Sequence, residues 1–154
     1  MSDKILTIIY GTETGNSRTL AQQVAKRAEK NGVAATVCDM ADFDVSGLSG
    51  LSTPVLFIVS TWGDGLPPAK AQPFFNAIAA SPALPDLSYA VLGLGDLNYE
   101  QFCQAGKTLD AALAKLGGKL IVPRADLGED FQVTYIGWAK RFWQALAVIY
   151  GIVK

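Results

Sequence analysis

Short apolar runs rich in β-branched residues alternate along the chain with segments of helical spacing, and this alternation limits the possible folds most. The runs, which we predict to be strands, are 5–10, 33–39, 54–60, 89–95 and 119–123. Strand–helix alternation of this kind is typical of a parallel sheet with helices on both faces. The almost continuously apolar run 54–60 fits such a sheet, because its strands are buried on both sides. The sequence therefore predicts an α/β fold with a doubly wound, five-stranded parallel sheet.

The helices between these strands are predicted from the positions of their apolar residues. The first helix carries its apolar stripe at Leu20, Ala21, Val24, Ala25 and Ala28, and the closing helix at Trp138, Phe142, Leu146 and Ile149. Helices are also expected over 71–80 and from about 99 to 116, whereas the polar stretch 40–53 is expected to be weakly structured. The length of 154 residues and the lack of a low-complexity linker favour one domain, 1–154.

Composition narrows the class of function. A formal net charge of −1 argues against a nucleic-acid-binding surface, which needs a strong basic excess. The sequence contains no histidine, the commonest metal ligand, and only Cys38 and Cys103 can supply thiolates, so no metal site is expected. Polar residues interrupt the apolar runs, and the N-terminus lacks a long apolar segment. We therefore expect a cytoplasmic, monomeric protein that binds neither membranes nor nucleic acids.

Ligands of parallel α/β sheets bind beyond the carboxyl ends of the strands, where the strand order reverses. The loops in these places, 11–17, 60–68 and 93–103, have the least ordinary composition of the chain. The first loop combines two glycines, which let the backbone fold tightly, with four side chains that can donate hydrogen bonds: Thr12, Thr14, Asn16 and Ser17.

This first loop lies directly before a helix N-terminus, whose unpaired N–H groups suit a phosphate. It lacks the lysine of triphosphate-binding loops and the closely spaced glycines of dinucleotide-binding loops. The loop therefore favours a single phosphate monoester held by neutral donors. Such a ligand needs neither the lysine nor the Mg²⁺ that triphosphate chemistry requires. A capped helix without a ligand is the alternative.

Trp62 and Tyr99 lie in the second and third loops, directly after buried strands, where a large exposed ring is unusual. Two aromatic rings on neighbouring loops can enclose a flat heteroaromatic ligand. Polar groups that suit the edge of such a ring lie between them, at Ser60, Thr61, Gly95 and Asp96. A phosphate at one loop and a planar ring at the other two favour a mononucleotide ligand. The alternatives are that Trp62 packs into the core or that both rings form a partner surface.

With these loops taken together, the chain resembles the flavodoxin family, whose ligand is FMN. Three segments carry the resemblance, which covers nearly the whole length: Thr-Glu-Thr-Gly-Asn-Ser at 12–17, Ser-Thr-Trp-Gly-Asp at 60–64 and Gly-Asp-Leu-Asn-Tyr-Glu-Gln-Phe-Cys at 95–103. The last two look like segments of small bacterial flavodoxins. The stretches 63–75 and 102–118 are more similar to FMN domains of diflavin reductases such as the sulfite reductase flavoprotein. The resemblance implies a flavodoxin-like sheet in the order 2-1-3-4-5.

The resemblance also implies which residues bind FMN. The phosphate would be bound by Thr12, Glu13 through its backbone, Thr14, Gly15, Asn16 and Ser17. Trp62 and Tyr99 would flank the isoalloxazine ring. Its edge would be lined by Ser60, Thr61, Gly95, Asp96 and Cys103, and Leu94 and Phe102 would also belong to the cofactor site. Gly63 would offer its carbonyl to the flavin N5–H after one-electron reduction. No catalytic residue and no metal ligand is implied.

The implied function is that of a flavodoxin, an electron carrier rather than an enzyme, which shuttles single electrons through the semiquinone and hydroquinone forms of FMN. Its partners would be a flavodoxin reductase-type donor and an acceptor enzyme. The near-neutral charge, unusual for a flavodoxin, predicts docking to these partners through apolar contacts of Trp62, Leu66, Pro67 and Pro68.

Several alternatives to a free carrier are open from the sequence. One is an FMN domain or subunit of a diflavin-reductase-type system, and another is an FMN-dependent quinone reductase. A signalling receiver domain of the same topology would need an acidic cluster where Tyr10, Gly11 and Thr12 stand. A flavin-free interaction module would bind no FMN.

Overall fold

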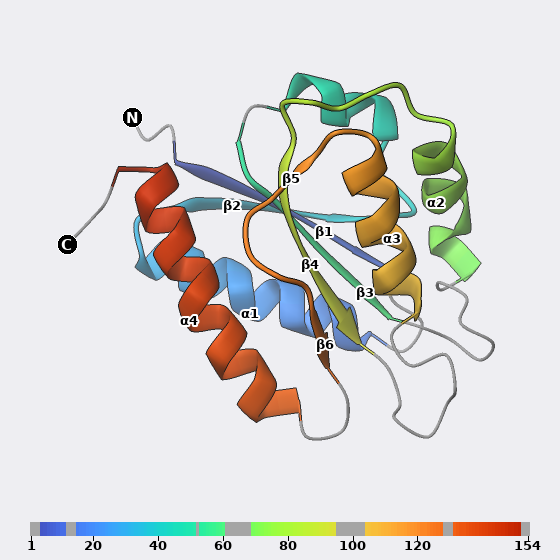
Figure 1. Cartoon of the computed structure of the whole chain (residues 1–154). Helices are drawn as coiled ribbons and strands as arrows, with labels where there is room; N and C mark the ends of the chain where they lie inside the picture. Colours follow the sequence, from blue (N-terminus) through green and yellow to red (C-terminus); the bar gives the residue numbers. More distant parts are fainter. Residues whose placement is uncertain are drawn as a thin grey trace.

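Six parallel strand segments form one sheet in the computed structural model, which describes residues 4–11, 15–51, 53–60, 69–94, 104–127 and 131–151 (Figure 1). They are β1 (Ile5–Gly11), β2 (Ala34–Asp39), β3 (Val55–Ser60), β4 (Ser88–Leu94), β5 (Lys119–Leu120) and β6 (Ala125–Leu127). The order is β2-β1-β3-β4-β5, and β6 pairs with β4 further along that strand than β5 does. The predicted doubly wound parallel sheet and its order 2-1-3-4-5 are therefore confirmed.

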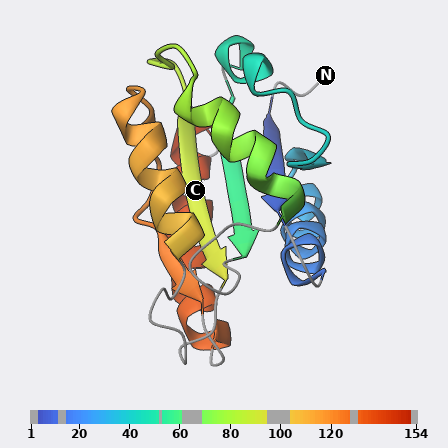
Figure 2. The ribbon, with the colours of Figure 1, turned by 90° about the vertical axis from the view of Figure 1, so that its right-hand side faces the viewer.

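Four α-helices of the described chain cover the two faces of this sheet. They are α1 (Asn16–Lys30), α2 (Gln72–Ala79), α3 (Gln104–Lys115) and α4 (Phe131–Ile149). The cores show that α1 and α4 pack on one face and α2 and α3 on the other. In Figure 2, α2 and α3 accordingly lie in front of the strands and α4 behind them. None of the helices in the described residues is both long and apolar enough to cross a membrane.

The predicted apolar stripes of the first and last helices pack into the core, where Ala25 is only partly buried, and one residue departs from this pattern. The buried residues are Leu20, Ala21, Val24 and Ala28 of α1 and Trp138, Phe142 and Leu146 of α4. Ile149 was predicted to join them, but this is wrong, because its side chain is 48% exposed. Tyr150, four residues after Leu146 on the same helical face, packs against the core instead. Its hydroxyl donates a hydrogen bond to the backbone carbonyl of Ile5.

This tyrosine predicts a dependence of stability on alkaline pH. Burial raises the pKa of Tyr150 to about 12, above the value of about 10 for an unfolded tyrosine. Between these two values the folded state keeps a proton that the unfolded state releases. The contribution of Tyr150 to the free energy of unfolding is therefore complete below pH 10 and is lost as the pH rises towards 12. We expect Tyr150→Phe to lower the free energy of unfolding by about 1 kcal/mol at pH 8, through the lost hydrogen bond.

Urea unfolding of wild type and Tyr150→Phe, measured from pH 8 to pH 11.5, checks this expectation. The difference between the free energies of unfolding of the two proteins should narrow above pH 10, because the ionised phenol can no longer donate its hydrogen bond. All other tyrosines are common to both proteins, so their titration cancels in the difference. A difference in the free energy of unfolding that stays constant from pH 8 to pH 11.5 would contradict the raised pKa of Tyr150.

The stretch 40–51 is more ordered than predicted. It contains a 3₁₀-helix, η1 (Val45–Gly50), and a second such turn, η2 (Ala69–Ala71), precedes α2. Val45 and Leu48 are buried in the core on the α2 side of the sheet. The carboxylate of Asp44 accepts hydrogen bonds from the backbone N–H and the hydroxyl of Ser46 and so caps the turn. The prediction of weak structure was wrong because so short a helix shows no clear periodicity.

The predicted fifth strand, 119–123, is interrupted, so the prediction of one continuous strand was wrong. The backbone N–H of Lys119 donates to the carbonyl of Leu87, directly before β4, and that of Ile121 to the carbonyl of Tyr89 in β4, each at 2.7 Å. In a parallel ladder the next donor would be residue 123, and Pro123 has no N–H. Pairing therefore stops after β5 and resumes in β6.

Candidate functional site

The three predicted ligand loops leave the sheet from adjacent strands. β1 lies between β2 and β3, and β3 lies between β1 and β4. The register pairs Gly11 with Val59 and Ser60 with Leu94, so these strand ends lie side by side, as the arrowheads of β3 and β4 show in Figure 2. Since β2 and β3 lie on opposite sides of β1, this is the edge where the strand order reverses. The fold thus brings the bases of all three loops to one place.

Most of the predicted ligand residues lie outside the described part of the chain. These are Thr12, Glu13, Thr14, Thr61, Trp62, Gly63, Gly95, Asp96, Tyr99, Phe102 and Cys103, together with the predicted docking residues Leu66, Pro67 and Pro68. The described ones are Gly15, Asn16, Ser17, Ser60 and Leu94. They lie at the start of α1 and at the ends of β3 and β4, and so form the frame from which the loops leave.

Gly15 is the N-cap of α1 and has a left-handed backbone, with φ of 93° and ψ of −4°. Residues with a Cβ atom adopt this region only at a cost, which explains the glycine. Its carbonyl accepts hydrogen bonds from both the backbone N–H and the hydroxyl of Thr19, each at 3.0 Å. The first turn of α1 contains no acidic residue, and Arg18 is exposed there. The positive end of the helix dipole is therefore suited to an anion.

Ser17 and Ser60 join the first loop to the second. Their hydroxyl oxygens lie 2.8 Å apart, and Ser17 is completely buried. In such a pair one hydroxyl donates to the other, and the accepting hydroxyl keeps its own proton for a further acceptor. The sequence predicted Ser17 at the phosphate and Ser60 at the ring edge. The structure places the two hydroxyls together, so the end of β3 lies against the first turn of α1.

Gly11 ends β1 in surroundings that leave no room for a side chain. A Cβ atom there would lie 2.8 Å from Met40 Sδ, 3.1 Å from Ala71 Cβ and 3.3 Å from Val59 Cγ2. The sequence suggested that this glycine serves a tight turn around the ligand. Close packing under η2 is the reason that the structure gives, and it fixes where the first loop begins.

Two titratable groups near this edge stay neutral at physiological pH. Burial raises the pKa of the Cys38 thiol, and the charges of Asp42 and Asp39 raise it further. Burial likewise raises the pKa of Tyr10, at the end of β1. A protonated thiol is a poor nucleophile, so the surroundings of Cys38 do not activate it.

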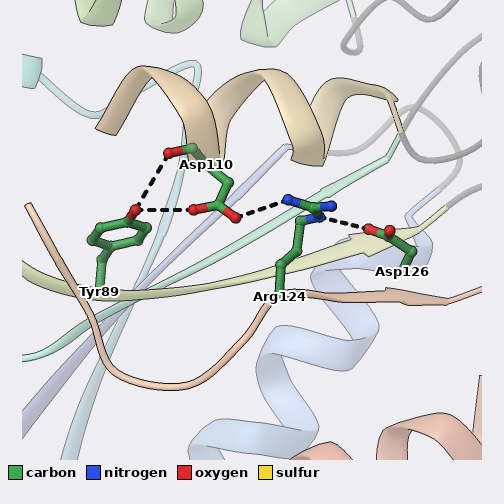
Figure 3. A network of polar contacts seen from close by, with 4 residues as sticks. All are labelled: Tyr89, Asp110, Arg124 and Asp126. Carbon is green, nitrogen blue, oxygen red and sulfur yellow. Dashed lines mark hydrogen bonds and ion pairs between the residues drawn. The ribbon is translucent and has the colours of Figure 1, made fainter. Parts of the chain in front are cut away.

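Four residues on the α3 side of β4 form a polar network (Figure 3). The hydroxyl of Tyr89 donates to the Asp110 carboxylate at 2.9 Å. Arg124 donates to the other oxygen of Asp110 through Nη1 at 2.8 Å and to Asp126 through Nε at 2.9 Å. Burial raises the pKa of Tyr89, and the bonded Asp110 carboxylate raises it further, so the hydroxyl remains a donor. The network, which the sequence did not suggest, ties β4, α3 and β6 together.

Comparison with known proteins gives one family and several relatives. The family model described as Flavodoxin matches residues 8–136. The sulfite reductase (NADPH) flavoprotein alpha-component of Bacillus subtilis is 42% identical over 137 residues, which are 88% of this chain and 22% of the relative. The protein of the same name from Vibrio cholerae is 38% identical over 138 residues, with the same shares of 88% and 22%. The chain thus spans less than a quarter of the length of these relatives.

Two solved structures have the same fold. A short-chain flavodoxin associated with a PDU bacterial microcompartment aligns with a TM-score of 0.82 at 21% identity, covering 97% of this chain and 99% of its own. A flavodoxin of Streptococcus pneumoniae aligns with a TM-score of 0.82 at 24% identity, covering 94% and 98%. At these identities the likeness concerns the fold alone.

Proposed function

The chain belongs to the flavodoxin family, and from this premise we propose that it binds FMN and carries single electrons between redox proteins. A flavin cofactor and electron transfer follow from the family and from relatives that are named flavoproteins, as the sequence predicted. The choice of FMN, and the residues that hold it, belong to the proposal. Its basis is that the described frame of the site fits a phosphate at one point and a planar ring beside it.

The observation that carries the proposal is the meeting of Ser17 and Ser60 at the N-terminus of α1. Their hydroxyls lie 2.8 Å apart at the base of the first two loops, beside the left-handed Gly15. A buried hydroxyl pair that keeps one proton to donate, next to a positive helix end, suits a phosphate monoester. The adjacent strand ends, Ser60 and Leu94, provide the base on which a flat ring can lie.

The three loops have separate roles in this proposal. The hydroxyls of Thr12, Thr14 and Ser17, with backbone N–H groups of 13–17, would hold the phosphate. Trp62 and Tyr99 would enclose the ring and exclude water from it, and the Gly63 carbonyl would accept a hydrogen bond from the N5–H that the flavin carries once it is reduced. When bound, FMN supplies the redox chemistry, and the protein orients it and sets its potentials.

The single FMN-binding domain, 1–154, is proposed to act as a cytoplasmic carrier, with a flavodoxin reductase-type donor and an acceptor enzyme as partners. A second candidate is the FMN module of a diflavin-reductase-type system. It is favoured by the 42% identity to the sulfite reductase flavoprotein component of Bacillus subtilis. In either role the chain transfers electrons for a partner enzyme rather than converting a substrate itself.

Flavin titration of the apoprotein tests the cofactor. We expect FMN fluorescence to be quenched with a stoichiometry of one FMN per chain, because aromatic side chains and the buried site quench the bound ring. Anaerobic reduction of the complex should then proceed in two resolved one-electron steps. An apoprotein that binds no FMN would refute the proposal. Steady oxidation of NADPH by the isolated holoprotein with a quinone acceptor would favour the quinone reductase instead.

A further inference from the structure

The two short strands at the edge of the sheet, β5 and β6, are joined by more residues than their pairing needs. Leu120 pairs with Tyr89 of β4, and Ala125 pairs with Leu92. Four residues, 121–124, therefore lie opposite two residues of β4. Ile121 and Val122, neighbours in the chain, both contact the core on the α4 side, so the alternation of a strand is lost here.

This excess means that the chain connection does not set the register of β6. A slip by two residues would keep the alternation of side chains, since strand faces repeat every second residue. The buried residues of β6, Ala125 and Leu127, would then still face the same side of the sheet. Apolar burial therefore selects the face of β6 but not its position along β4, and another interaction must fix that position.

The polar network of Figure 3 lies at this point. Arg124 is the last residue before β6, and it bridges Asp126 of β6 and Asp110 of α3 through two different nitrogens. Asp110 in turn accepts from Tyr89, the β4 residue that pairs with Leu120 of β5. The side chains of Arg124 and Asp110 are only 25% and 15% exposed, so the ion pairs are shielded more than surface pairs. A slip of β6 would carry Arg124 and Asp126 together past α3 and so break the contact of Arg124 with Asp110.

The same elements frame the third predicted ligand loop. β4 ends at Leu94, directly before segment 95–103, and α3 begins at Gln104, directly after it. Asp126 pairs with Gly93, and Leu127 with Leu94. Arg124 therefore links Asp126, which lies beside the end of β4, to Asp110, six residues after the start of α3.

We propose that Arg124 is a positioning residue of the flavin site, which sets the register of β6 and fixes α3 against β4 around segment 95–103. The inference rests on the proposed FMN function. Arg124 does not touch the ligand in this proposal, and it acts through Asp110 and Asp126. Lysine cannot replace it fully, because a single ammonium group lacks the planar fork that reaches two carboxylates in different directions.

The test compares Arg124→Met with Arg124→Lys in the FMN-loaded protein and the apoprotein. For Arg124→Met we expect the FMN dissociation constant to rise about tenfold through misplacement of the loop frame. We also expect faster amide hydrogen exchange at 125–127 and a shift in the midpoint potentials of bound FMN. Arg124→Lys should recover part of each effect. Arg141→Met on the exposed side of α4 is the matched control and should leave all three quantities unchanged.

A second control separates positioning from general stability. Ile78→Ala removes buried apolar volume near the end of α2, a helix that supplies no residue of the network, and lowers the melting temperature. It should leave the FMN potentials and the exchange at 125–127 unchanged. If Arg124→Met behaves like Ile78→Ala, with a lower melting temperature but the wild-type dissociation constant and potentials, the positioning role is overturned. A wild-type protein that binds no FMN overturns the proposed function and this inference together, an outcome that differs plainly from the first.

Discussion

Gly11→Val is expected to lower the free energy of unfolding by about 3 kcal/mol, the upper end of the usual cost of overpacking a core. The Cβ atom alone would lie 2.8 Å from Met40 Sδ and 3.1 Å from Ala71 Cβ, and valine adds two methyl groups to it. Met40 is itself only 2% exposed and has little space to yield. Because Gly11 is followed by the predicted phosphate loop, FMN affinity should fall as well. Urea unfolding and FMN titration measure the two effects.

Gly47 provides the control for this substitution. A Cβ atom at Gly47 would lie 3.7 Å from Phe43 Cζ, which is an ordinary van der Waals contact. Gly47→Ala should therefore change stability much less than Gly11→Ala, although both changes add one methyl group to a glycine. Equal costs for the two alanine variants would show that the packing around Gly11 yields easily and that the expected effect is wrong.

Riboflavin, which is FMN without its phosphate, is expected to bind at least about a hundredfold more weakly than FMN. Hydrogen bonds to a charged group contribute about 1.5–3 kcal/mol each, so the loss of two of them already gives this factor. Ser17→Ala should reduce the affinity for FMN about tenfold or more, through one such bond, and leave the affinity for riboflavin unchanged. Parallel titrations with the two flavins measure this selectivity directly.

The contact between Ser17 and Ser60 sharpens this experiment. If the two hydroxyls act as a pair, Ser60→Ala should also reduce FMN affinity more than riboflavin affinity, and the double variant should lose less than the sum of the two. Ser49→Ala, at an exposed serine of η1, is the control and should change neither affinity. Equal binding of FMN and riboflavin by the wild type would show that the start of α1 holds no phosphate.

Much of the fold was predictable because each central strand is an apolar run that ends in a turn or loop. β1 and β3 extend over 5–11 and 55–60, against predictions of 5–10 and 54–60. Such runs are long enough to be recognised from composition alone. η1 could not be recognised in this way, since its six residues, with only two of them buried and apolar, carry no period.

The break in the fifth strand shows a different limit. Pro123 is visible in the sequence, but its effect depends on whether residue 123 must donate to the ladder. In the structure the backbone N–H groups of Lys119 and Ile121 donate, so residue 123 would be the next donor of the ladder. Likewise, Ser17 and Ser60 were both singled out, yet their hydrogen bond joins residues 43 apart and depends on the register of β1 with β3. The places of Ser17 at the start of α1 and of Ser60 at the end of β3 were thus predictable, and the contact between them was not.

The hydrogen bond from Tyr150 to Ile5 has a consequence for the order of events during synthesis. It joins residues 145 apart, and α4 supplies Trp138, Phe142 and Leu146 to the core that covers β1 on one face. While the ribosome is still translating the last helix, that face of the sheet exposes apolar side chains to water. A growing chain of this topology therefore completes its native core only after residue 150 has emerged, and until then its exposed apolar face is prone to aggregation.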